Sequence, residues 1–299
     1  MPNTDQAATD QTAEERSSIE PRNIHFDFDA RLPVNWHSDD PAISHFYDAL
    51  SLTFPEGERF FIESVRRFES RIEDPALRRN VRAFTAQEAT HSREHSAYNR
   101  LLGARGIPVE RFERLMRRAM SVSQRWIPAK TQLAVTCAYE HYTALFAESI
   151  LGDPRVMAGA HPLYRDLWRW HAMEEEEHKA VAFDVYRTVA PGLSGYLRRV
   201  LAMGVATVDF MIAIPLLQAW LMAKSGEFRN LRSWMRAFRH LWISPGVWRR
   251  VMFGVFAYFA PGFHPSRRRL APEVLAWRAH YRATKSRTAE MSPGLFGEG

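Results

Sequence analysis

The feature that most constrains this chain is a Glu-x-x-His spacing that occurs twice, at Glu88–His91 and at Glu175–His178. Successive residues of an α-helix are rotated by about 100°, so side chains three or four positions apart share one face. His95 follows the first copy by one turn and His171 precedes the second by one turn. Carboxylates and imidazoles on one face suit iron, manganese or zinc. A single copy could equally be a solvated acidic face, and the repetition favours a metal site.

Helical periodicity dominates the rest of the chain, and prolines and glycines separate the segments. Strand periodicity, a glycine-rich phosphate loop and a Ser/His/Asp order are not found in the sequence. The fold class predicted is therefore all-α. We expect a short helix over 41–52, four long helices over about 54–72, 75–102, 129–151 and 162–189, and a short basic helix within 104–128.

Two further carboxylates lie on apolar helix faces, Glu58 in the first long helix and Glu140 in the third. At about 1.5 Å rise per residue, antiparallel pairing brings Glu58 level with Glu88 and Glu140 level with Glu175. An unpaired buried carboxylate is costly, so these groups need a cation, a base or a proton. Glu58 could instead complement the helix dipole from the first turn.

Two other carboxylates are weaker candidates than this pair. Glu69 leans toward the face of Glu58, and Glu148 lies too close to the end of its helix to level with Glu175. The resulting order along the chain is Glu, Glu-x-x-His, Glu, Glu-x-x-His. That order is similar to the ligand set of ferritin-like di-metal carboxylate proteins, which takes one Glu from each of two helices and a Glu-x-x-His from each of the others.

The chain resembles the bacterial family of predicted metal-dependent hydrolases and, more widely, the ferritin-like di-iron oxidases and oxygenases. The motifs that carry the resemblance are Phe54-Pro55-Glu56-Gly57-Glu58, Glu88–His91, Glu140, His171–His178 and Pro261-Gly262-Phe263-His264-Pro265. The resemblance implies a ferritin-like four-helix bundle with a di-metal centre and extra C-terminal helices. It also implies two iron ions as cofactor, with a manganese–iron pair or zinc as alternatives.

Seven residues are expected to be metal ligands: Glu58, Glu88, His91, Glu140, His171, Glu175 and His178. His171 is similar to the seventh ligand of the aryl-amine N-oxygenases of that superfamily, and otherwise would orient a ligating carboxylate. His95 is expected behind the ligands. A buried polar network without metal is the alternative for the whole site.

The C-terminal third differs from the rest in charge, because residues 196–290 hold 16 Lys and Arg against four acids. Residues 200–223 form an apolar run long enough to span a bilayer, but Asp209 and Pro215 argue against a simple span. Residues 228–242 alternate arginines with large apolar residues, a pattern typical of a membrane interface. Nucleic acid is not expected as a partner, since no binding motif is present.

The domain organisation expected is a disordered tail over 1–20, a ferritin-like helical bundle over 21–195 and a basic, apolar helical region over 196–290. The last region would pack on the bundle or on an anionic membrane surface. Cys137 is the only cysteine and no signal peptide is visible, which indicates a cytoplasmic protein, either free, peripheral at the inner membrane or inserted in it.

Three functions are compatible with these features. The first is an O2-dependent di-iron oxidase or oxygenase, which would use O2 and an electron donor to oxidise a hydrophobic or aromatic small molecule. The second is a metal-dependent hydrolase that uses a metal-activated water. The third is a non-catalytic, membrane-associated metal-binding bundle. The oxygen-rich ligand set without sulfur favours the first in the sequence alone.

Overall fold

A computed structural model describes residues 19–267 and 272–285, and these are helical apart from their connections and an extended N-terminal arm. Within those residues no strand forms, and His37 and Ala160 make an isolated β-bridge. The all-α class is therefore confirmed. Most of the tail predicted over 1–20, and residues 268–271 and 286–290 of the C-terminal region, lie outside the described residues.

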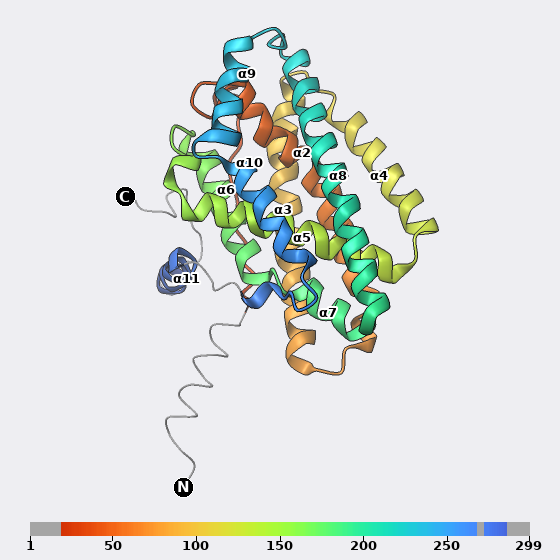
Figure 1. Cartoon of the computed structure of the whole chain (residues 1–299). Coiled ribbons are helices and arrows are strands. Elements are labelled where there is room, and N and C mark those ends of the chain that lie inside the picture. Colours follow the sequence, from red (N-terminus) through yellow and green to blue (C-terminus); the bar gives the residue numbers. More distant parts are fainter. Residues whose placement is uncertain (1–18, 268–271, 286–299) are drawn as a thin grey trace.

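Four helices surround the centre of the molecule: α2 (Pro41–Arg66), α3 (Pro75–Ala104), α5 (Ala129–Gly152) and α6 (Pro162–His178). Helix α2 packs along α3, α5 packs along α6, and the two pairs meet through α2 with α5 and α3 with α6 (Figure 1). Asp40 and Asp74 cap α2 and α3, each accepting a hydrogen bond from a first-turn amide, and a proline follows each cap.

Helix α2 corrects the sequence prediction, which expected one helix to end near Leu52 and another to begin at Phe54. The structure has a single helix that continues through Pro55 and ends at Arg66. A proline inside a helix leaves the carbonyl four residues earlier without its partner. Here that carbonyl belongs to Ser51, and Asn99 Nδ2 of α3 donates to it at 3.0 Å.

The fourth predicted helix, over 162–189, is also divided. Helix α6 ends at His178, the chain turns, and α7 (Val181–Val189) follows. The predicted basic connection contains α4 (Val109–Trp126), in which Val109 is the one buried residue and the others are half-buried or exposed. Short helical turns complete the chain at η1 (Glu69–Arg71), η2 (Pro154–Val156), η3 (Arg239–Ile243), η4 (Phe256–Phe259) and η5 (Pro265–Arg267).

The C-terminal third forms α8 (Gly192–Lys224), α9 (Leu231–Phe238), α10 (Val247–Val255) and α11 (Pro272–Lys285). Helix α8 packs on α2 and α5, and α10 packs on α5 (Figure 1). Among the described helices, α8 alone is long and apolar enough to cross a membrane by length and composition. Only 33% of its most apolar window is buried inside the protein.

Candidate metal centre

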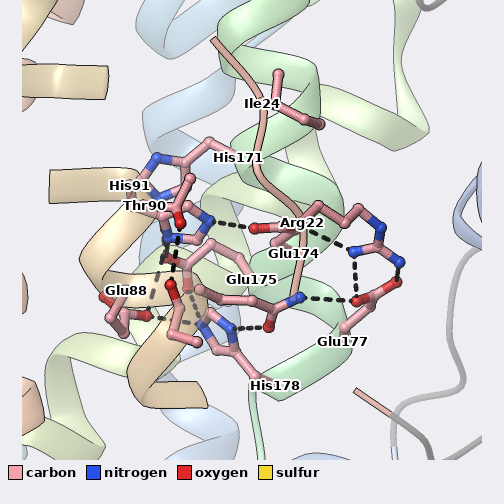
Figure 2. Close-up of polar contacts among 12 residues, drawn as sticks. Arg22, Ile24, Glu88, Thr90, His91, His171, Glu174, Glu175, Glu177 and His178 are labelled. Carbon is pink, nitrogen blue, oxygen red and sulfur yellow. Dashed lines mark hydrogen bonds and ion pairs between the residues drawn. The ribbon is translucent and has the colours of Figure 1, made fainter. Parts of the chain in front are cut away.

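All seven residues expected to bind metal lie together in the interior, in two adjacent groups. The first group is Glu58, His91 and His171, and the second is Glu88, Glu140, Glu175 and His178. Within each group one nitrogen or oxygen atom from every residue lies within 4.8 Å of the others. His91 Nδ1 connects the groups, at 3.9 Å from carboxylate oxygens of both Glu88 and Glu175. Figure 2 shows Glu88, His91, His171, Glu175 and His178 converging from α3 and α6.

Most of the converging atoms have no hydrogen-bond partner. Both carboxylate oxygens of Glu58, Glu88 and Glu140 are buried without a hydrogen bond, and so are His91 Nδ1 and His178 Nε2. His178 Nε2 lies 3.0 Å from Glu88 Oε1 without hydrogen-bonding geometry. Buried polar groups are normally satisfied, and isolated buried charges are costly. Eight such atoms around one point fit cations held between them.

The ring nitrogens that face away from the centre are all hydrogen-bonded. His91 Nε2 lies 3.0 Å from Glu174 Oε2, a carboxylate that can only accept, so Nε2 carries the proton. Gln87 donates its amide nitrogen to Glu177 and thereby turns its oxygen toward His178 Nδ1, at 3.0 Å. Both imidazoles therefore turn their other nitrogen toward the centre, and that nitrogen binds metal in its unprotonated form.

His171 is oriented in the same way through a longer path. Ser51 Oγ donates to Asn99 Oδ1 and lies 2.9 Å from His95 Nδ1, so His95 donates to Ser51. His95 Nε2 is then an acceptor, and it lies 2.8 Å from His171 Nδ1. His171 Nε2 lies 2.9 Å from Glu175 Oε1, and because a carboxylate can only accept, this contact takes either a proton or a metal ion between the two atoms.

Outside the ligands, an arginine from the N-terminal arm compensates the acidic residues of α6. Arg22 makes ion pairs with Glu174 at 3.0 Å and with Glu177 at 2.7 Å (Figure 2). Its guanidinium also lies over the rings of Trp277 and Tyr281. Glu174 is thus held between a cation and His91, which fixes the orientation of that imidazole.

The pKa values at the centre are shifted because its carboxylates are buried with too little positive charge nearby. Burial, followed by the charges of Glu88 and Glu175, raises the pKa of Glu58 well above its usual value. Burial and Glu88 likewise raise the pKa of Glu140. Burial alone would lower the pKa of His178, but Glu175 and Glu88 outweigh it and raise that pKa well above the usual range. Bound cations would take the place of these protons.

An apolar cavity of about 420 Å³ reaches the centre from the surface. Glu58, His171 and Glu175 form its inner end, while α4 and α8 both contribute to its walls, with residues such as Met116 and Ile214. Thr143, on the cavity wall, donates a hydrogen bond to Glu175 Oε2. The candidate metal ligands at the inner end are thus accessible to an apolar molecule.

Several residues that shape the centre were not found from the sequence. Thr143 lies one turn after Glu140 and Gln87 directly precedes Glu88, so helical periodicity could have placed both near the ligands. Arg22 lies more than 150 residues before its partners, and no spacing signal connects them. Glu69 and Glu148, the weaker candidates, belong to neither group.

A family model described as a predicted metal-dependent hydrolase matches residues 20–269, from the N-terminal arm through α10. No curated protein and no solved structure matches the chain. The family match corrects the function favoured from the sequence, since it names a hydrolase and not an O2-dependent di-iron oxidase or oxygenase. The physical reason for the error is that carboxylate and imidazole ligands suit metals used either for redox chemistry or as Lewis acids.

Proposed function

The chain belongs to the predicted metal-dependent hydrolase family, and from that membership we propose that it hydrolyses an apolar small molecule with a water activated by two metal ions. The observation that supports a pair of ions is the set of buried, unpartnered ligand atoms from four helices. A fully buried group of this kind is stable only with compensating positive charge.

In this proposal Glu58, His91 and His171 hold one ion, and Glu88, Glu140, Glu175 and His178 hold the other. One glutamate from each of α2 and α5 and a Glu-x-x-His from each of α3 and α6 would make this a ferritin-like di-metal bundle. The oxygen-rich set without thiolate favours iron or manganese over zinc of the structural type. Iron is the first candidate to test.

Metal ions bound there would supply Lewis acidity, which lowers the pKa of a water molecule toward neutrality. The protein side chains supply orientation and exclude bulk water. Glu174, Gln87 and His95 keep the three imidazoles in the metal-binding form, and Thr143 directs Glu175 by hydrogen bonding to one of its oxygens. These contacts preorganise the centre before a substrate arrives.

The substrate class follows from the cavity. Its walls are mainly aliphatic and aromatic, and the polar groups lie chiefly at the metal end. Away from that end, Tyr139 donates a hydrogen bond to Asp209 at 2.5 Å, which joins α5 to α8 at the cavity wall. We infer a substrate with an extended apolar part and a single hydrolysable group, such as an ester or amide.

The test is a metal-dependent hydrolysis assay. Protein stripped of metal should be inactive toward a series of nitrophenyl esters, and iron, manganese or zinc should restore activity that rises with acyl-chain length. Glu175→Ala should lose metal and activity together, while Glu148→Ala, a carboxylate of α5 outside both groups, should keep both. Metal-loaded protein that hydrolyses no ester or amide would reject the proposal.

A further inference from the structure

The outward face of α8 carries a continuous apolar stripe. Its residues recur every three or four positions and expose between 54% and 72% of their surface: Leu193, Leu197, Leu201, Val205, Val208, Ile212 and Leu216. From first to last the stripe is about 35 Å long at 1.5 Å per residue. Soluble monomers rarely expose so long an apolar row, and such a row marks an interaction surface.

The opposite face of the same helix belongs to the protein core. Met203, Ala206, Phe210 and Ile214 are buried, and Phe210 stacks on Tyr142 of α5 at 4.8 Å between ring centroids. A helix that spanned a bilayer alone would lose these contacts. The apolar stripe therefore faces outward from a helix that stays in the fold.

Further large apolar side chains are exposed in the elements that follow α8. Helix α10 contacts α8 where Trp248 stacks on Phe210, at 5.4 Å between ring centroids. Large exposed side chains extend over the loop before α9, α9 itself, η3, α10 and η4: Phe228, Leu231, Met235, Phe238, Ile243, Phe253 and Phe256. We call these residues and the α8 stripe the apolar face.

Arginines without carboxylate partners lie within this region. Arg236 pairs with Asp40 and Arg250 pairs with Asp153. Arg229, Arg232 and Arg239 are exposed, and among the described residues none of them makes an ion pair. Exposed apolar side chains together with unpaired arginines are the chemistry of a surface that enters an anionic lipid interface.

We propose that the apolar face docks on a bilayer with anionic headgroups, without α8 leaving the fold. A second copy of the chain is the alternative occupant, but a two-fold interface built from this face would bring the unpaired arginines of both copies into one contact area. Anionic phosphates complement them. Helix α8 also forms one wall of the cavity, so docking places the cavity beside the lipid.

The experiment is co-sedimentation of the full chain with vesicles of phosphatidylcholine alone or with about one third phosphatidylglycerol. Binding should be at least about tenfold stronger with the anionic lipid and should weaken at high salt without vanishing, because the apolar contribution is not screened. Protein that remains in the supernatant with anionic vesicles at low salt would overturn the proposal.

Matched variants locate the surface. Leu197→Glu with Leu201→Glu, and separately Arg232→Glu with Arg239→Glu, should each reduce binding at least about tenfold, while metal content stays unchanged. Arg79→Glu with Arg82→Glu, exposed on α3, is the control and should have little effect. Equal loss in the control would overturn the assignment of the face.

Two other outcomes would also reject it. Sedimentation velocity could find a dimer that Leu197→Glu with Leu201→Glu dissociates, which would assign the face to a second copy. Protein that resists alkaline carbonate extraction from vesicles would indicate a spanning helix instead of a docked one. A monomer in solution that carbonate releases from anionic vesicles supports docking.

Discussion

The candidate metal centre and the apolar face both depart from the usual distribution of side chains, the centre by burying charged groups and the face by exposing apolar ones. The centre buries four carboxylates where apolar residues are normal, and the apolar face exposes seven leucine, isoleucine and valine side chains on α8 where polar residues are normal. In our proposals each region is completed from outside the chain, by cations at the centre and by lipid at the apolar face. The departures from ordinary partition thus indicate where ligands bind.

The two regions differ in how narrowly they specify a ligand. At the centre, the outward nitrogens of His91, His171 and His178 are each fixed by a hydrogen bond, so donor atoms and positions are defined. The apolar face has no comparable fixed polar geometry and is defined by area and charge. Substitutions at the centre should therefore act individually, and substitutions on the face should act in proportion to their number.

The largest effect is expected from removing metal. An ion present at a thousandfold excess over its Kd adds about 4 kcal/mol to the stability of the folded state, so a chelator should lower Tm by roughly 8 °C. Glu175→Ala and His178→Ala should contain less metal and respond less to the chelator, and Glu148→Ala should behave as wild type. Elemental analysis and calorimetry measure both. Full metal content in both ligand variants would contradict the centre.

Helix α8 allows the interior and the exterior to be compared on one element. Phe210→Ala removes a buried ring and should cost about 3 kcal/mol, whereas Leu201→Ser on the outward face should change the free energy of unfolding by less than about 0.5 kcal/mol. Urea denaturation without lipid measures both. A large loss with Leu201→Ser would mean that the outward face is covered by protein and not free for lipid.

His240 is a buried histidine outside the candidate metal centre, and its burial should make the stability of the protein depend on pH. Burial, with a smaller contribution from His37, lowers its pKa to about 3, while the unfolded chain has a histidine pKa near 6.5. The unfolded state then binds a proton that the folded state does not, so stability is complete above about pH 6.5 and falls as the pH drops toward 3.

Between pH 7 and pH 5 this histidine should account for a loss of about 2 kcal/mol. His240→Gln, which can still accept from Tyr47, should remove that part of the pH dependence in denaturant titrations at the two pH values. An unchanged slope in the variant would show that other groups cause the acid sensitivity.

The smallest effect is expected from Glu58→Gln. Since burial and its carboxylate neighbours raise the pKa of Glu58, replacing the acid by a neutral amide should stabilise the metal-free protein by about 1 kcal/mol. The same change should weaken metal binding, so stability with metal should fall. Thermal melts with and without chelator distinguish the stabilisation of the metal-free protein from the destabilisation of the metal-loaded protein. Glu63→Gln, exposed on the same helix, should change neither.

Much of the fold and of the centre follows from helical periodicity. Glu58 and Glu88 could be paired because both lie at similar distances from the turn at Asp74, and Glu140 and Glu175 because they flank Gly152 and Pro162 in the same way. These are consequences of a fixed rise per residue in antiparallel helices. They place ligands without any knowledge of packing.

Contacts between distant segments could not be predicted in that way. Arg22 reaches Glu174 and Glu177 only because the extended arm crosses α6, and neither residue's neighbours in sequence indicate it. The turn after His178 and the joining of two predicted helices at Pro55 depend on tertiary partners. The chemistry was misassigned for a different reason, since ligand types alone do not determine what a bound metal does.

Pro55 has a consequence for the direction of the hydrogen bonds behind His171. Because it has no N–H, the carbonyl of Ser51 accepts from Asn99 instead, and the amide of Asn99 can lie in only one sense. With the amide oriented in this way, Ser51 donates to Asn99, His95 donates to Ser51 and His171 donates to His95. Each donor therefore points away from the metal-ligand residues. The backbone hydrogen bond that is missing at Pro55 thereby sets the donor direction of this buried series of hydrogen bonds.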